Sequence, residues 1–329
     1  MVHLYMKKIM IRYVIKRLLS VILIILGGAF VAFTFLYLVP GGNGLDVARL
    51  ILGTSASQEQ LVEKAHLLGV DEAYFVQLGK YFFNTFLRFD FGTSWRDGSS
   101  VIQSIGQRAG HTLIVGGFGL ILNVIVGTAL GIFAATHEGK WQDSLTMIIA
   151  MVFVSAPGFW VALMCINLFS VQLGWLSPIF VEGDWTSYIM PTVTGALGGI
   201  AINARQSRSA MLEVIRADYV TTARSKGQIE RKVVWKHMLP NAMMPIITGV
   251  GGGLAMIVAG SPVMELLFSI PGIGAYMLSG INGRDRPVVV GCVIFFALFT
   301  GVVMILTDLA YAFLDPRIKA QYASGRRKK

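Results

Sequence analysis

The residues that could perform covalent chemistry do not form a recognisable catalytic group in this sequence. It contains no Gly-x-x-x-x-Gly-Lys-Ser/Thr phosphate loop, the pattern whose backbone amides cradle nucleotide phosphates. It also lacks a His-Glu-x-x-His zinc motif and a Ser-His-Asp constellation. Asp90-Phe-Gly92 matches a kinase triplet, but no glycine-rich loop or catalytic loop accompanies it. We therefore predict a chain with no catalytic residue, which is not an enzyme.

The positions of the two cysteines do not indicate redox or metal chemistry. Cys165 and Cys292 both lie within apolar stretches, where thiols act as small hydrophobic side chains. Their separation fits no metal or redox spacing. The sequence predicts no metal site and no cofactor bound by this chain.

Two carboxylates, Glu265 and Asp308, fall inside apolar stretches. Burying an ionised carboxylate in hydrocarbon costs several kcal/mol unless it is paired or hydrated, so each needs an explanation. Glu265 precedes Phe268 and the Pro271-Gly272 break, and there a pathway group and a hydrogen bond between helices fit equally well. Near Tyr311, Asp308 favours the structural role. Glu265 is therefore the candidate for a translocation pathway.

The elements that must position these residues are membrane spans. Apolar residues make up 54% of the chain and charged residues 14%, against about a quarter charged in soluble domains. The apolar residues come in blocks, and a block of about 20 can cross a bilayer. Six spans are predicted, and Gly249 to Gly253 with Pro245 and Pro262 makes the fifth easily bent and a candidate pathway wall. The predicted spans are Leu18–Val39, Thr112–Ala135, Leu145–Val171, Ser187–Arg205, Met243–Phe268 and Val288–Phe313.

Lysine and arginine are placed as in a membrane protein. They gather before the first span, between spans four and five, and after the sixth, whereas residues 41–111 are slightly acidic. Because basic residues favour the cytoplasmic side, both termini and the basic loop are predicted inside and residues 41–111 outside. The basic residues do not show the aromatic interleaving of a nucleic-acid surface, so no nucleic-acid partner is predicted.

This arrangement predicts four regions. Residues 1–40 form the cytoplasmic N-terminus and first span, and residues 41–111 form an external insertion. Residues 112–316 form a five-helix core that includes a cytoplasmic hairpin at 205–241, and residues 317–329 form a basic cytoplasmic tail. Within the insertion, Glu59 to Leu68 and Tyr74 to Phe89 have helical periodicity. We expect a small helical domain that lies against the membrane surface.

The hairpin has the strongest local signals. Met211 to Ser225 lacks glycine and proline and can continue a helix out of span four. Gly227 is placed to end it in the left-handed conformation. A second helix, Ile229 to Met238, is expected to stop at Pro240, which removes an amide donor. The result would be a short helix held crosswise at the membrane surface and able to enter a cleft of a partner, although a solvated basic loop would also obey the charge rule.

This hairpin resembles the loop by which ABC importer permeases dock on their ATPases: Glu-Ala-Ala, three residues, Gly, nine residues, Ile-x-Leu-Pro. Thr221 and Thr222 stand in place of the Glu-Ala pair, so no carboxylate role carries over. His237 replaces the isoleucine. The candidate coupling residues implied by the resemblance are Ala223, Arg224, Lys226, Gly227, His237, Leu239 and Pro240.

Further motifs resemble the dipeptide, oligopeptide and nickel permeases of this class, in particular the subunit with the long first external loop. They are His237–Ala242, Glu265–Gly274, Arg284–Val288 and Asp315–Ile318, with Leu68-Gly69 and Asp90–Ser94 in the insertion. One departure is Arg286, where the family often has an aromatic residue. Another is the poorly matching segment Ile179–Tyr188, which leaves the substrate open.

The resemblance implies an all-α integral membrane protein with six transmembrane helices, like a type I ABC importer permease. It implies a multi-pass protein of a bacterial-type inner membrane that forms half of a pathway for peptides. The implied partners are a second homologous permease chain, two cytoplasmic ATPases that bind ATP and Mg, and an external substrate-binding protein. The alternative is an ion-coupled secondary transporter or channel, but inverted repeats are not evident. A structural scaffold would leave the hairpin unexplained.

Overall fold

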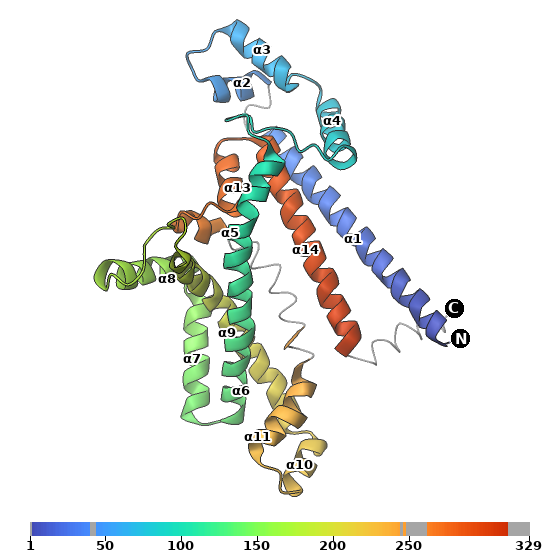
Figure 1. Cartoon of the computed structure of the whole chain (residues 1–329), viewed down its shortest axis with the longest axis vertical. Helices are drawn as coiled ribbons and strands as arrows, with labels where there is room; N and C mark the ends of the chain where they lie inside the picture. The colour runs from blue at the N-terminus through green and yellow to red at the C-terminus, as the bar shows by residue number, and fades with distance from the viewer. Residues whose placement is uncertain (1, 40–43, 244–245, 248–261, 315–329) are drawn as a thin grey trace. The chain divides into compact units, whose positions relative to one another are not determined.

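The computed structural model in Figure 1 describes residues 2–39, 44–243, 246–247 and 262–314. These residues form helices and no strands, apart from one antiparallel bridge between Thr93 and Ser100. The predicted all-α fold class is confirmed. The chain divides into two compact units. The first unit comprises Met1–Leu18, Leu113–Ile270 and Val302–Lys329, and the second unit comprises Leu19–Thr112 and Pro271–Gly301.

Among the described residues, three helical stretches are long and apolar enough to cross a membrane. They are Arg17–Leu38 in α1 (Val2–Leu38), Val101–Thr136 through α5 (Val101–Leu122), η1 (Asn123–Gly127) and α6 (Thr128–Thr136), and Arg286–Ile305 in α14 (Arg286–Leu314). Their mean hydropathies are 2.6, 2.2 and 2.8. These stretches match the first, second and sixth predicted spans, although the second helix begins at Val101 rather than Thr112.

The third predicted span, Leu145–Val171, is not one continuous helix. The helix α7 (Trp141–Ser155) and the combined helix of α8 (Gly158–Cys165) and η2 (Ile166–Gln172) meet at 103°. The bend lies at Ala156 and Pro157, whose ψ angles are 131° and 125°. Proline disfavours helical backbone in the residue before it, which accounts for the break. The pair is a broken span or a re-entrant loop.

The fourth and fifth predicted spans differ in how far the structure describes them. The fourth lies in α9 (Ile189–Ile215), which is not among the apolar stretches and continues past Arg205. The fifth lies largely outside the described residues, including Pro245 and 249–253. The described residues therefore contain three of the six predicted spans, or four if the bent pair counts as one.

Small residues allow close packing of α6 on α9 in the first unit. A Cβ atom on Gly131 would lie 2.5 Å from the Ser207 Cβ, and one on Gly127 would lie 2.9 Å from the Asn203 Cβ. Gly199 approaches the Asn123 side chain in the same way. These glycines let the helices pack closely, because any larger side chain would separate the backbones.

The second unit contains the helices α2 (Gly44–Leu52), α3 (Gln58–Leu68), α4 (Tyr74–Leu87) and α13 (Ile273–Asn282). α3 and α4 confirm the two helices predicted in the insertion. A reciprocal capping box between Ser57 and Gln60 starts α3. The sequence did not predict α13, which precedes α14.

Arg286 lies at the centre of the second unit. It begins α14, is 6% exposed, and its guanidinium carbon lies 4.7 Å from the ring centre of Phe33, 5.1 Å from Trp95 and 5.6 Å from Tyr37. Its Nη1 donates to Gln77 Oε1 at 2.8 Å. The cation is therefore held by aromatic faces and one neutral amide. We call Arg286, Phe33, Tyr37, Gln77 and Trp95 the arginine cage.

Candidate functional site

The hairpin between α9 and the fifth predicted span is built from separate short helices. α9 ends at Ile215, α10 runs from Asp218 to Ser225, and α11 (Glu230–Lys232) leads into the π-helix η4 (Val233–Met238) (Figure 1). The predicted continuous helix Met211–Ser225 is wrong, because Ala217 has an extended backbone with ψ 144°. This break turns α10 back so that its apolar side chains reach the end of α9.

Gly227 makes the turn of the hairpin, as predicted. Its φ is +72°, in the left-handed region that glycine adopts with little cost. Its amide donates to the Arg224 carbonyl at 2.9 Å, and the Gln228 amide donates to the Ala223 carbonyl at 3.4 Å. These two bonds are those of a Schellman motif. A Cβ on Gly227 would meet nothing within 4 Å, so the backbone conformation alone selects glycine here.

An apolar core holds the hairpin on the ends of α6 and α9. Val220 and Ala223 of α10 and Val233 and Met238 of η4 are buried against Met211 of α9. Ala223, the second alanine of the resemblance, thus faces inward, where a small side chain lets α10 pack closely. Leu239 packs at the edge of the same core. The hairpin is therefore a packed element rather than a solvated loop.

Arg224 joins the two arms of the hairpin in a bidentate ion pair. Its Nη2 donates to Glu230 Oε1 at 2.6 Å and its Nε donates to Glu230 Oε2 at 3.1 Å. The hydrogen bond from Arg224 lowers the pKa of Glu230 below its ordinary value. The sequence analysis did not select Glu230, although opposite charges flanking a glycine turn were a signal that could have identified it.

His237 makes a second link across the turn. Its Nε2 lies 2.9 Å from Gln228 Oε1, so the imidazole that replaces the family's isoleucine forms a polar contact. The helix does not stop at Pro240 as predicted, because residues 239–243 remain helical. The Leu239 amide donates to the Val234 carbonyl, five residues back. We attribute the continuation to this wider turn, which relieves the clash that a proline causes in a regular helix.

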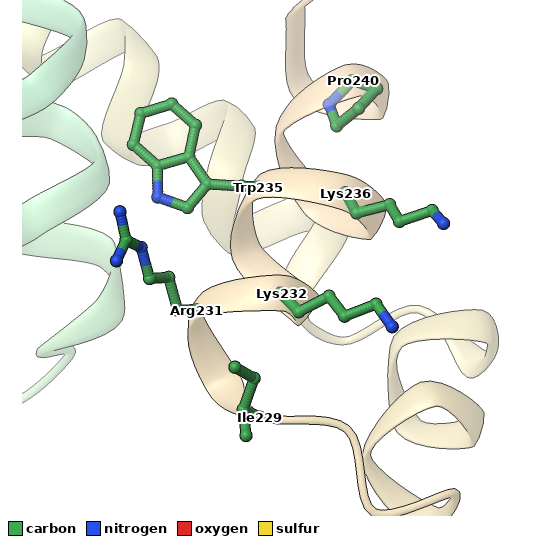
Figure 2. A pocket seen from close by; sticks show the side chains of 6 residues that line it. All are labelled: Ile229, Arg231, Lys232, Trp235, Lys236 and Pro240. Atoms are coloured by element: carbon green, nitrogen blue, oxygen red, sulfur yellow. The ribbon is translucent and has the colours of Figure 1, made fainter.

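The outer surface of the hairpin is basic and partly aromatic. A groove of about 780 Å³ is lined by Ile229, Arg231, Lys232, Trp235, Lys236 and Pro240. Figure 2 shows Arg231 and Trp235 projecting from one side of the helix and Lys232 and Lys236 from the opposite side. Lys226 is also exposed, next to the turn. Of the predicted coupling residues, Arg224, Lys226, Gly227 and Pro240 are exposed, whereas Ala223 is buried.

Two ion pairs tie the base of the hairpin to the connection between α6 and α7. In α9, the Arg208 Nε donates to Asp143 Oδ1 at 2.6 Å and its Nη2 donates to Asp143 Oδ2 at 2.7 Å. Arg216 donates to Glu138 at 2.9 Å. Sequence reasoning missed these pairs because their partners are far apart in the chain. They add to the rigidity of the hairpin where it leaves α9.

The structure does not bring Glu265 into the hairpin. Glu265 is 0% exposed and lies in the helical residues 262–267, next to Met264, which packs in one apolar cluster with Ala162 of α8 and Met190 of α9. Its role in a pathway remains a prediction. The side chain of Asp308 lies outside those described. Among the described residues, no group of three or more His, Cys, Asp or Glu side chains could hold a metal ion.

Comparisons with known proteins identify the family of this chain. Residues 127–320 match the family described as "Binding-protein-dependent transport system inner membrane component", and residues 10–115 match the N-terminal family of the same components. The dipeptide transport system permease protein DppB of Alkalihalophilus pseudofirmus is 36% identical, over 94% of this chain and 100% of the relative. The glutathione transport system permease protein GsiC of Escherichia coli K12 is 35% identical, over 94% of this chain and 99% of the relative.

A solved structure supports the fold. The inward-facing MetNI methionine ABC transporter aligns with a TM-score of 0.51 and 18% identity, over 65% of this chain and 96% of the other. This likeness bears on the fold alone. The family and the curated relatives confirm the resemblance to peptide-type ABC permeases and do not support the ion-coupled alternative. The chain belongs to the binding-protein-dependent transport system inner membrane components, as a multi-pass permease subunit of an ABC importer whose ATP hydrolysis resides in other chains.

Proposed function

We propose that this chain forms half of the translocation pathway of a peptide importer and that residues 205–241 transmit the motion of a cytoplasmic ATPase. The complete transporter would contain a second homologous permease chain, two ATPases that bind ATP and Mg, and an external binding protein. The observation that carries the proposal is the packed hairpin: Val220, Ala223 and Val233 anchor it to α9, and its charged turn is exposed. A rigid element can transmit force, whereas a solvated loop cannot.

The contact with the ATPase is assigned to the exposed side of α10 and its turn. Thr221, Thr222, Ser225 and Lys226 are exposed there, on the side opposite the buried Val220 and Ala223. A short helix of this kind fits a cleft that offers acidic or polar groups to the basic turn. Arg224 is held by Glu230 and so keeps a fixed position beside that contact.

The proposed cargo is a small peptide. Relatives at 36% and 35% identity carry the names of dipeptide and glutathione permeases, and both substrates are short and zwitterionic. Uptake of labelled dipeptides, tripeptides and glutathione, measured in cells with and without this chain, tests the assignment. If none of these compounds is taken up, the peptide assignment is wrong, but the permease role still holds.

The proposed topology follows the charge distribution. Both termini, residues 205–241 and the tail at 317–329 face the cytoplasm, the insertion at 41–111 faces outward, and residues 112–316 form the core. In a background without Cys165 and Cys292, a cysteine at Ser57 should react with an impermeant thiol reagent in whole cells. A cysteine at Ser225 should react only after lysis. The reverse labelling would contradict the topology and the docking role together.

Crosslinking tests the docking contact directly. In the assembled transporter, Ser225→Cys should crosslink to the ATPase subunit with a short bifunctional thiol reagent. Lys140→Cys is a matched control, because Lys140 is also exposed but lies in the turn before α7. Crosslinking through position 140 and not through position 225 would move the contact to the other connection and contradict the proposal.

A further inference from the structure

One face of α4 in the second unit is apolar and uncovered. Phe75, Phe83 and Leu87 are 81%, 50% and 68% exposed, and Val76 is exposed beside them. At 100° per residue these positions form one stripe along the helix. We call Phe75, Val76, Phe83 and Leu87 the α4 stripe.

The opposite face of α4 fixes its place against a membrane span. The Tyr74 hydroxyl lies 2.6 Å from the Thr34 hydroxyl of α1. The Tyr74 ring lies 6.2 Å from Phe33 and 4.9 Å from Tyr37, and Tyr81 lies 5.5 Å from Phe33. All three α1 residues belong to the last turns of the apolar stretch Arg17–Leu38. α4 is therefore packed on the end of a helix that crosses the bilayer.

The depth of this contact places α4 at the interface between lipid and water. Thr34 lies four residues before the end of α1 at Leu38, which is about 6 Å along the helix axis. The headgroup region of a bilayer is about 5–8 Å thick on each side. A helix held at this level must present its uncovered face to headgroups and upper acyl chains or to another protein.

The surface of α1 next to this contact is itself apolar. Phe30, Val31, Phe35 and Leu38 of α1 are exposed, as expected for a lipid-facing span. The α4 stripe belongs to the same helix pair, so a lipid occupant extends a surface that already faces lipid. Arg88 lies at the end of α4, with its guanidinium carbon 5.1 Å from the Phe83 ring centre, where it can reach lipid phosphates while the ring remains apolar.

Phe89 supports the same surface. It has φ +56° and is 77% exposed. A non-glycine residue is strained in this conformation, and glycine commonly follows a helix end at this position. The exposed ring of this strained residue is available to a partner outside the chain. It lies two residues beyond Leu87, at the end of the stripe.

We infer that the α4 stripe is an interfacial membrane anchor that seats the insertion on the outer leaflet, with phospholipid acyl chains as its partner. Apolar and aromatic side chains on a helix lying in the interface bind in this way. The anchor would hold the insertion at a constant depth in the outer leaflet. This inference does not depend on which solute is carried.

A depth measurement in the assembled transporter tests the anchor. In a background without Cys165 and Cys292, Phe83→Cys is labelled with an environment-sensitive fluorophore in phosphatidylcholine–phosphatidylglycerol nanodiscs. Nitroxide groups on the lipid acyl chains should quench it several-fold more than they quench the same label at Leu67→Cys, and aqueous iodide should show the opposite order. Leu67 is a matched control because it is 73% exposed and lies on α3.

Two outcomes would overturn the inference. If iodide quenches position 83 as strongly as position 67, the stripe faces water. If position 83 is shielded from both quenchers, a protein partner covers it instead of lipid. Leu87→Cys is labelled in parallel, so that a defect in one variant does not prevent the measurement. The fluorescence readout needs no transport, so it can fail while the proposed import function holds.

Discussion

Arg224 joins the two arms of the hairpin in the first unit, and Arg286 joins separate helices of the second unit, but their surroundings are opposite. Arg224 meets a carboxylate, Glu230, and the two side chains are 38% and 56% exposed. Arg286 meets aromatic faces and Gln77, is almost fully buried, and its Nε has no hydrogen-bond partner among the described residues. The first is an ion pair at a surface, and the second is a buried cation with no counter-charge in the part of the chain that the structure describes.

This difference determines how much each contact can contribute to the stability of the folded chain. An exposed ion pair is screened by water and salt and fixes geometry more than stability. A buried cation has lost its hydration, so its neighbours must compensate, and any variant that disturbs them should be costly. We therefore expect the arginine cage to govern the stability of the second unit, and the Arg224 pair to make a small contribution to the first.

The largest expected effect is at Arg286. Truncation to alanine removes the packing of a long side chain between three rings and should cost about 2–5 kcal/mol, like other large truncations in a core. Arg286→Met keeps most of the volume and removes the buried charge, so its cost should be at most about 2 kcal/mol. Unfolding of the purified chain in mixed detergent micelles, followed by circular dichroism, measures both.

Arg286→Lys distinguishes charge from shape in the same assay. Lysine keeps the charge but lacks the planar group that lies over Phe33 and Trp95, and its ammonium is more strongly hydrated. It should therefore destabilise more than methionine. A lysine variant as stable as the natural chain would show that charge alone holds the cage, and the contrast with Arg224 would need revision.

Gln77 is the next most sensitive position. Its Oε1 accepts from Arg286, and its Nε2 donates to the carbonyls of Val70 and Glu72 at 3.0 and 2.6 Å. Gln77→Leu leaves these buried groups unpaired and should cost about 1–3 kcal/mol. In a double-mutant cycle with Arg286→Met the two costs should be less than additive, whereas full additivity would mean that the two side chains act independently.

The Arg224 pair should be much weaker. Because both side chains are largely exposed, a double-mutant cycle with Arg224→Ala and Glu230→Ala should give a coupling of about 0.2–1 kcal/mol. Raising the salt concentration should reduce it further. A coupling as large as the cost of Arg286→Ala would contradict the comparison between the two arginines.

The pH dependence gives the smallest effect. Arg224 lowers the pKa of Glu230 in the folded chain, so the pair contributes stability above the unfolded pKa of about 4.3. That contribution is lost as the pH falls through the lower folded pKa. The difference in melting temperature between the natural chain and Glu230→Gln should shrink as the buffer is taken from neutral pH to below pH 4. An unchanged difference would show that the ionised carboxylate is not involved.

Local sequence signals predicted the parts of the molecule that depend on local chemistry. Gly227 was identified from its position after a helix, and its positive φ depends on its own backbone. Gly127 and Gly131 lie four residues apart on one helix face, a spacing that favours the close packing seen in the structure. Three of the six predicted spans also match apolar helices among the described residues, because a run of apolar residues is itself a local signal.

The remaining features depend on contacts between distant segments. The arginine cage draws Phe33, Gln77, Trp95 and Arg286 from α1, α4, a loop and α14, and no spacing rule connects these positions. The break before α10 could not be predicted because Ala217 itself gives no helix-stop signal. By contrast, Pro157 was a visible signal for the bend of the third span, but the apolar pattern outweighed it.

The central claim is that the hairpin is a rigid element whose geometry couples this chain to an ATPase. Gly227→Val should strain a φ of +72° by about 1–2 kcal/mol, and Gly227→Asn should be milder because asparagine tolerates this conformation. Gly53→Val is the matched control, because Gly53 also follows a helix, has φ +87° and equally open space, and lies in the insertion, away from the hairpin and the ion pairs at its base.

The deciding measurement is ATP hydrolysis by the reconstituted transporter, stimulated by the loaded binding protein, with each variant at equal membrane abundance. The account predicts that Gly227→Val loses most of the stimulated activity, while Gly227→Asn and Gly53→Val retain it. Full stimulated hydrolysis by the Gly227→Val transporter, or an equal loss in the Gly53→Val transporter, would contradict the claim that this hairpin transmits the motion.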